Sequence, residues 1–182
     1  MRALLLFANG TEEVEALTPL DYLRRAGVEV VFVGLSDRAQ VGAHGICVNT
    51  DICLDELDVD TEFDMLIIPG GMPGTNNLEA SDKVQLLIDC AVKRDAFLAA
   101  ICAAPKIYGA RGITRGKRAV CYPGFEKYLD GAIVCREKAV RDGKLITATG
   151  AGAANEFALE LISALCGEDK ASEIGRSVRF FI

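Results

Sequence analysis

The sequence predicts an α/β fold, a flavodoxin-like three-layer α/β/α sandwich with a mainly parallel central sheet. Apolar runs of strand length alternate along the 182 residues with longer segments of helical period, as in βα units that build a parallel sheet covered on both faces. Hydrophobic residues make up 51% of the chain, which is enough for a well-filled core. Because no repeat, linker or low-complexity stretch interrupts this pattern, we expect a single domain over residues 1–182.

In the first part of the chain the pattern predicts three buried strands and one helix. The strands are expected at 2–8, 28–34 and 63–68, and the helix at 11–26. Pro19 lies inside that helix and either kinks or restarts it. Between residues 41 and 54, short β-branched runs broken by glycine predict a hairpin or an edge strand rather than another crossover unit.

The second part begins with the turn-rich segment 69–74 and continues the alternation. Its expected elements are a helix at 81–93 capped by Ser81, a strand at 96–101, a helix at 103–110, a hairpin at 139–149 around Asp142-Gly143, a long helix opened by 150–152 and ending at 165, and a short helix at 168–175. Cys102 falls at the corner between the fourth buried strand and its helix.

Charge and cysteine content argue against several classes of function. The net charge is -6, from 20 basic and 26 acidic residues without a run of either sign, so we expect no nucleic-acid or membrane partner. The apolar start is cut off at Asn9-Gly10, before it reaches the length of a signal peptide or a membrane span. Seven cysteines without the paired spacing of a metal knuckle favour free thiols in a cytoplasmic location, with no metal ligands.

The sharpest candidate for chemistry is Cys102. It lies between small residues where a buried strand turns abruptly into a helix, and such neighbours leave room for a strained nucleophile elbow. Nearby backbone N–H groups, that of Ala103 among them, would favour the reactive thiolate. The alternative is that Cys102 is a small buried residue with no chemical role, as free cysteines often are.

Two further segments end at the same edge of the expected sheet. Glu12, Glu13 and Glu15 open the first helix, where solvation and the helix dipole account for acidic residues without catalysis. A carboxyl beside a thiolate would need a raised pKa to act as its hydrogen-bonding partner. Gly70 and Gly71 either present N–H groups to an oxyanion or form an ordinary tight turn.

Other catalytic arrangements lack support. The lone histidine, His44, falls in the expected hairpin, where we expect a surface or pairing residue, so a protease-like Cys-His couple is not apparent. The turn after the first strand is too acidic for a phosphate cradle, which argues against a bound flavin.

Taken together, these segments resemble the ThiJ/PfpI superfamily, and more closely its Parkinson-disease-protein branch of deglycase or glyoxalase III-like proteins. The resemblance covers nearly the whole chain. It rests on the segments Ala99 to Pro105, Ile68 to Gly71, Asn9 to Glu15 leading to Arg24-Arg25-Ala26-Gly27, and Gly150 to Gly152 before Glu156-Phe157-Ala158-Leu159.

The resemblance implies roles for individual residues. The family's nucleophile falls on Cys102, its glutamate on Glu15 and its oxyanion-side glycines on Gly70 and Gly71. Where many relatives have a histidine before proline, this chain has Tyr122, which can donate a hydrogen bond but is a poor base near neutral pH. A protease triad is therefore doubtful.

The implied function is a cofactor-free enzyme that acts on a small dicarbonyl such as methylglyoxal, or on glycated protein. Cys102 would attack the carbonyl, and Glu15 would move a proton. The alternative is an oxidative-stress sensor or redox-regulated chaperone in which Cys102 is oxidised to the sulfinic acid. The family also implies a homodimer.

Overall fold

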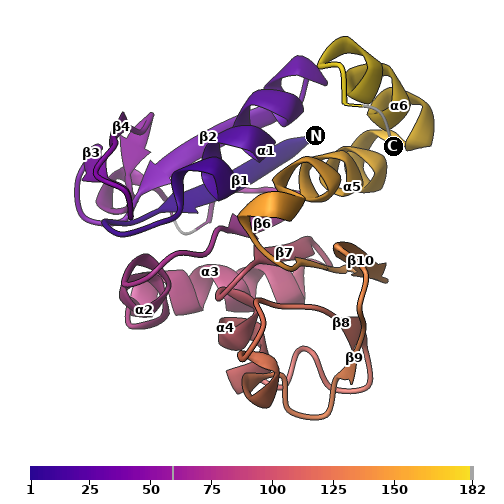
Figure 1. Ribbon diagram of the computed structural model, residues 1–182. Helices are drawn as coiled ribbons and strands as arrows, with labels where there is room; N and C mark the ends of the chain where they lie inside the picture. The colour runs from indigo at the N-terminus through magenta and orange to yellow at the C-terminus, as the bar shows by residue number, and fades with distance from the viewer. Residues whose placement is uncertain (59, 181–182) are drawn as a thin grey trace.

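The computed structural model describes residues 1–58 and 60–180 and has a seven-stranded sheet at its centre (Figure 1). The strand order is β10-β11-β7-β6-β1-β2-β5, and every neighbouring pair is parallel except the antiparallel pair β10-β11. The strands are β1 (Arg2–Phe7), β2 (Glu29–Gly34), β5 (Ile52–Cys53), β6 (Met65–Ile68), β7 (Phe97–Ile101), β10 (Ala139–Asp142) and β11 (Leu145–Ala148).

Helices cover both faces of this sheet. One layer consists of α1 (Glu13–Arg25), α5 (Ala154–Cys166) and α6 (Glu168–Ser177), and the other of α2 (Gly74–Glu79), α3 (Asp82–Lys93) and α4 (Pro105–Ala110). Side chains alternate along each strand, so β1 directs Leu5 into the core under α1 and α5, and Leu4 into the core under α3 and α4. The flavodoxin-like three-layer fold expected from the sequence is confirmed.

Short elements complete the fold. The expected hairpin is present as β3 (Ala39–Val41) and β4 (Cys47–Asn49), which pair antiparallel, and β5 follows it as the sheet's edge strand. The remaining short elements are the 3-10 turns η1 (Leu54–Glu56), η2 (Glu126–Tyr128) and η3 (Ala151–Ala153) and the parallel two-residue strands β8 (Arg118–Ala119) and β9 (Ile133–Val134).

Of the two alternatives for Pro19, the structure excludes a restart, because Pro19 lies inside one continuous α1. Two boundaries differ from the sequence predictions. The segment after Gly74 forms the short helix α2 instead of ending as a loop. The helix after Cys102 begins at Pro105, because Cys102 has a left-handed backbone and Ala103 and Ala104 complete the turn. The Ser81 cap is confirmed, since its hydroxyl accepts a hydrogen bond from the N–H of Val84.

No helix in the described part of the chain combines the length and apolar character needed to cross a membrane.

The segment that follows β8 packs tightly on α4 through Gly109. A Cβ atom at Gly109 would lie 2.0 Å from the carbonyl oxygen of Tyr128, far inside van der Waals contact. The absence of a side chain at this position therefore lets η2 lie directly against α4.

We expect Gly109→Ala to lower the free energy of unfolding by about 1–3 kcal/mol, because either η2 or α4 must shift to admit the methyl group. Gly152→Ala is the control, since a Cβ there meets no atom within 4 Å. Urea unfolding followed by circular dichroism measures both. Equal stability of the two variants would contradict the close packing of η2 on α4.

Candidate active site

Three loops meet at the carboxyl edge of the sheet, after β1, β6 and β7. The N–H of Glu12 donates to the carbonyl of Gly70 at 3.0 Å, and the N–H of Gly74 donates to the carbonyl of Gly10 at 3.2 Å. These bonds join the loop after β1 to the loop after β6. Because ligands of open α/β sheets bind at this edge, the loops form the candidate site.

Cys102 occupies a strained turn at this edge. Its φ of 64° is in the left-handed region, which few residues other than glycine adopt. Its N–H donates to the carbonyl of Ala148 at 2.9 Å, and its carbonyl accepts from the N–H of Tyr122 at 2.8 Å. The structure therefore has the elbow that the small neighbouring residues predict, held by β11 on one side and by the Tyr122 segment on the other.

Glu15 is buried directly beside this turn. The residue is 1% exposed, and its Oε2 accepts a hydrogen bond from the N–H of Gly70 at 2.9 Å. A Cβ atom at Gly70 would lie 2.6 Å from both Glu15 Oε2 and Cys102 Cβ. Glycine at position 70 is thus required for the carboxyl and the cysteine to approach each other. The structure brings together the two side chains that the resemblance singled out.

The electrostatics of this pair differ from the expectation in one respect. Burial raises the pKa of Glu15 from its usual 4.5 to about 7, as a partner role requires. Burial, reinforced by the charge of Glu15, also raises the pKa of Cys102 from 9.0 to about 12, although the N–H groups of Gly71 and Ala103 oppose this change. The turn therefore does not favour the thiolate as the sequence predicts, because burial outweighs the effect of the N–H groups.

The N–H groups around the thiol divide between two tasks. Those of Gly71 and Ala103 interact with the Cys102 sulfur and favour its charged form. That of Gly70 is already donated to Glu15, so Gly70 is not a free oxyanion donor, contrary to one sequence expectation. Gly71 has a φ of 90°, and a Cβ there would lie 2.2 Å from the N atom of Glu12.

Tyr122 lies at the rim of the site. The residue is half-exposed. Its ring carbon Cδ2 lies 3.3 Å from the position that a Cβ atom would occupy at Gly150. Glu15 Oε1 is 3.8 Å from the same point. The ring and the buried carboxyl therefore flank Gly150 from two sides.

Glu13 and His44 have a structural role that the sequence did not indicate. Glu13, expected as a solvated residue, is 2% exposed, and its Oε1 accepts hydrogen bonds from the N–H groups of His44 at 2.9 Å and Ile46 at 3.3 Å. Burial opposes ionisation of Glu13, but these bonds hold its pKa below 4.5. The carboxylate thereby fixes the β3–β4 hairpin to the start of α1. His44 is exposed and paired with Glu13, as a surface or pairing residue should be.

The only metal-ligand cluster within the described residues is formed by Glu12, Glu13 and His44. Their ligand atoms lie within 4.8 Å of one another. The oxygens of Glu13 already accept hydrogen bonds from the hairpin, so this cluster is explained by the anchoring of β3 and β4.

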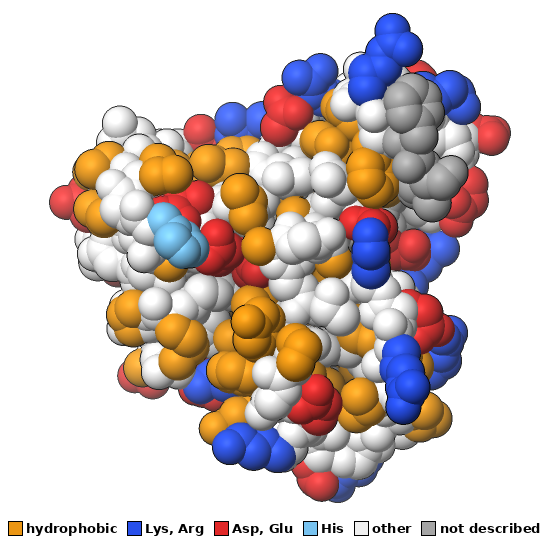
Figure 2. Space-filling model, in the orientation of Figure 1, with side chains coloured by type: hydrophobic (Ala, Val, Ile, Leu, Met, Phe, Trp, Pro, Cys, Tyr) orange, Lys and Arg blue, Asp and Glu red, His pale blue; other side chains and the backbone are white. Residues whose placement is uncertain are grey.

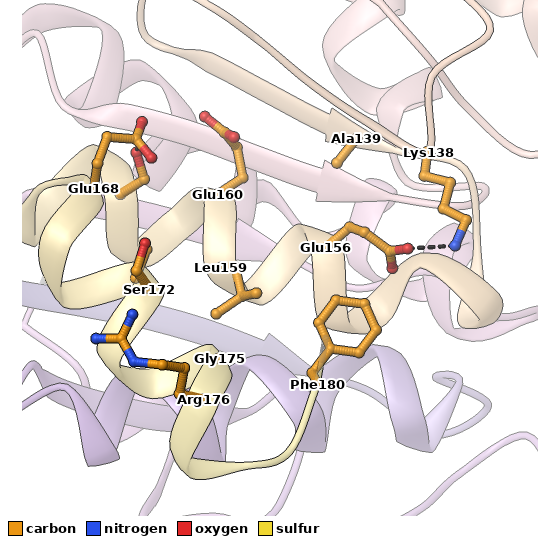
Figure 3. Close-up of a pocket in the computed structure, with 12 residues that line it drawn as sticks. Lys138, Ala139, Glu156, Leu159, Glu160, Glu168, Ser172, Gly175, Arg176 and Phe180 are labelled. Atoms are coloured by element: carbon orange, nitrogen blue, oxygen red, sulfur yellow. Dashed lines mark hydrogen bonds and ion pairs between the residues drawn. The ribbon is translucent and has the colours of Figure 1, made fainter. Parts of the chain in front are cut away.

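A cavity of about 520 Å³ lies elsewhere, between α5, α6 and the start of β10 (Figure 3). Lys138 and Glu156 form an ion pair at one end of it, and Arg141 beside it pairs with Glu160. Its lining contains no cysteine or histidine. Cys102 and Glu15 therefore lie outside this cavity.

Cysteines outside the site differ in their exposure. Cys47 and Cys166 are exposed, whereas Cys121 is buried. Exposure makes Cys47 and Cys166 accessible to reagents, so selectivity for Cys102 depends on its surroundings and not on the shielding of these two thiols.

Comparison with known proteins gives consistent matches along the chain. The model of the DJ-1/PfpI family matches residues 1–164. Protein DJ-1 homolog B of Arabidopsis thaliana is 35% identical over 176 residues, which are 95% of this chain but 40% of that protein. The glutathione-independent glyoxalase DJR-1.2 of Caenorhabditis elegans is 32% identical, with 94% and 91% of the two chains covered. A deglycase of Pyrococcus abyssi is 32% identical, with 69% and 75% covered.

Solved structures agree with these sequence matches. Oxidized DJ-1 of Toxoplasma gondii has a TM-score of 0.95 at 30% identity, with 100% of this chain and 99% of that chain covered. DJ-1beta of Drosophila melanogaster has a TM-score of 0.94 at 32% identity, with 100% and 98% covered.

The raised pKa of Glu15 predicts a specific pH dependence of stability. Glu15 releases its proton near pH 4.5 in the unfolded chain and near pH 7 in the folded chain. Its contribution to the free energy of unfolding is therefore complete below pH 4.5 and is lost as the pH rises to 7. The fall amounts to roughly 3 kcal/mol. In Glu15→Leu this component should disappear, while the exposed control Glu173→Gln should follow the wild type. Urea unfolding at several pH values measures it, and a parallel decline in wild type and Glu15→Leu would contradict the burial of an ionisable Glu15.

Proposed function

The chain belongs to the DJ-1/PfpI family, and from this premise we propose that it is a cofactor-free, Cys102-dependent enzyme acting on small reactive dicarbonyls or on their adducts with proteins. The observation that carries the proposal is the buried Glu15 carboxyl held against a cysteine in a left-handed turn. Relatives named as a glutathione-independent glyoxalase and as a deglycase support the same class of substrate.

The first step uses the shared proton of the pair. Glu15 has the lower pKa of the two, so its carboxylate takes the thiol proton of Cys102 as Sγ donates an electron pair to the aldehyde carbon of methylglyoxal. The π pair of the carbonyl moves onto its oxygen, where the N–H groups of Gly71 and Ala103 stabilise the charge. Glu15 then gives its proton to this oxygen, which completes a hemithioacetal and leaves a carboxylate.

The second step is a proton transfer between adjacent carbons. The Glu15 carboxylate removes the proton from the carbon bonded to sulfur, which forms an enediolate, and then returns it to the neighbouring carbon. The hydroxyl proton of the first carbon passes to the oxygen of the second, so the first becomes the carbonyl of a thioester and the second carries a hydroxyl group. The first carbon is thereby oxidised and the second reduced, so no external oxidant or cofactor is needed. Water cleaves the resulting thioester to lactate and restores the thiol. With a pKa of about 7, Glu15 can both give and take a proton near neutral pH.

Action on early sugar adducts would begin with the same nucleophile and the same oxyanion site. The redox-sensor alternative also depends on Cys102, and a DJ-1 structure described as oxidized is among the similar structures. Turnover separates the two: an enzyme consumes dicarbonyl in a saturable, catalytic manner, whereas a sensor is oxidised once per molecule. The functional names of the relatives favour the enzyme.

We further propose that residues 1–182 act as one domain and that the chain works as a homodimer in the cytoplasm. The apolar side chains of Val14, Val41 and Ile46 are exposed on α1 and the β3–β4 hairpin and offer a surface for such a contact.

Replacement of the nucleophile should remove the activity. In Cys102→Ser, consumption of methylglyoxal should be abolished without a change in fold, because the serine hydroxyl is too weakly acidic for this attack without a stronger base. Lactate formation by reduced protein measures it, with the exposed Cys166→Ser as a control that should keep the wild-type rate. Substantial turnover by Cys102→Ser would place the chemistry at another residue.

Glu15→Gln should lower kcat by about a hundredfold or more, because the amide keeps the size of the carboxyl but cannot carry the proton between carbons. Alkylation of Cys102 by iodoacetamide should continue, which separates loss of proton transfer from loss of the nucleophile. Glu173→Gln on α6 serves as the control. A near-normal kcat in Glu15→Gln would remove Glu15 from the reaction.

A further inference from the structure

Beside Cys102 the chain carries three aromatic residues that the reaction itself does not use. Tyr122, Phe125 and Tyr128, here named the aromatic wall, follow one another at intervals of three residues. The N–H of Phe125 donates to the carbonyl of Tyr122 at 3.0 Å, and the N–H of Tyr128 donates to the carbonyl of Phe125 at 2.9 Å. Successive tight turns of this kind bring the three side chains onto one side of the segment.

The rings of the aromatic wall contact each other in a fixed arrangement. The ring centroids of Tyr122 and Phe125 are 6.3 Å apart in an edge-to-face geometry, and those of Phe125 and Tyr128 are 5.6 Å apart. Both separations lie in the favourable range for aromatic pairs, about 4.5–7 Å. The three rings therefore form one contiguous aromatic surface.

The two tyrosines of the aromatic wall are exposed, whereas Phe125 between them packs against the core. Phe125 packs against the core formed with α3 and α4, whereas Tyr122 and Tyr128 are 50% and 44% exposed. Hydrophobic side chains gather around α4 on this face of the molecule (Figure 2). Aromatic surface left exposed and contiguous beside a reactive group indicates a binding surface.

Two lysines lie close to the Tyr128 ring of the aromatic wall. Lys106 Nζ is 5.8 Å from the centre of the Tyr128 ring and Lys127 Nζ is 5.1 Å from it. Lys106 also forms an ion pair with Glu79 at 2.8 Å, which connects the wall to the end of α2. These contacts favour one position of the Tyr128 ring.

The wall is continuous with the reactive centre. The N–H of Tyr122 donates to the carbonyl of Cys102, and the Tyr122 ring and Glu15 Oε1 face the same point beside Gly150. A carbonyl carbon bonded to Cys102 has Glu15 and the N–H groups of Gly71 and Ala103 around its reacting atoms. Its substituent must leave this buried space toward the rim, where the exposed Tyr122 ring lies.

We propose that the aromatic wall binds the substituent of electrophiles that react at Cys102, and that the chain therefore prefers aryl-substituted oxoaldehydes to methylglyoxal. This inference rests on the proposed function for its substrate, but the binding surface is a separate property. A flat apolar substituent would stack on Tyr122 and displace water from half-exposed rings, whereas a methyl group is too small to reach beyond the first ring.

The test compares an aryl-substituted electrophile with a small one, first as substrates and then as alkylating agents. For turnover, kcat/KM for phenylglyoxal is divided by kcat/KM for methylglyoxal. For binding without turnover, the rate of Cys102 alkylation by N-benzyl iodoacetamide is divided by the rate with iodoacetamide, followed by mass spectrometry of the Cys102 peptide. We expect both ratios to fall about tenfold in Tyr122→Ala. They should be retained in Tyr122→Phe, which keeps the ring, and in Ile133→Ala, an exposed apolar control outside the wall.

The outcomes separate the two proposals. If methylglyoxal is not consumed but the alkylation ratio still depends on the Tyr122 ring, the wall is supported and the enzymatic function is wrong. If methylglyoxal is consumed through Cys102 but neither ratio changes in Tyr122→Ala, the wall is wrong and the function stands. Unchanged ratios together with a smaller assembly of Tyr122→Ala in light scattering would assign these rings to a contact between copies and would also overturn the proposal.

Discussion

The lack of room for a side chain at Gly70 is the constraint on which the site depends. This position lies between the carboxyl of Glu15 and the Cβ of Cys102. A methyl group added at Gly70 would lie 2.6 Å from each of them. Because glycine leaves this space empty, the loop after β6 can approach both residues and donate its N–H to Glu15. Three loops that are far apart in sequence are thereby brought to one point at the carboxyl edge of the sheet.

The close approach has an electrostatic consequence. Two acidic groups share a buried space, and burial raises the pKa of each, so the pair carries one negative charge over a wide range above neutral pH. A single proton exchanged between carboxyl and thiol is a suitable starting point for chemistry that needs both a nucleophile and a proton carrier. The strained backbone of Cys102 is maintained by hydrogen bonds to Ala148 and from Tyr122, so β11 and the segment after β8 both support it.

The segment after β8 supports the Cys102 turn and also lies at the rim of the site. The segment that holds the Cys102 carbonyl also presents the Tyr122 ring, and it contains little regular secondary structure. In α/β proteins the sheet supplies a rigid frame and the loops adapt it to different ligands. Tyr122 thus lies at the rim of the site, whereas Glu15 and Gly70 are held by other segments of the chain.

The sequence by itself determined the α/β class, the order of the main strands and the longer helices, the Ser81 cap, the hairpins and the corner at Cys102, because these follow from periodicity and from small or turn-forming residues close together in the chain. The resemblance supplied Glu15. Only the tertiary structure decided that the N–H of Gly70 is committed to Glu15, 55 residues away, and that Glu13 is buried beneath the hairpin, 31 residues away. It also decided the direction of the Cys102 pKa and the arrangement of the aromatic wall. Burial and contacts of this kind depend on which distant segments the fold places side by side, and no local pattern contains that information.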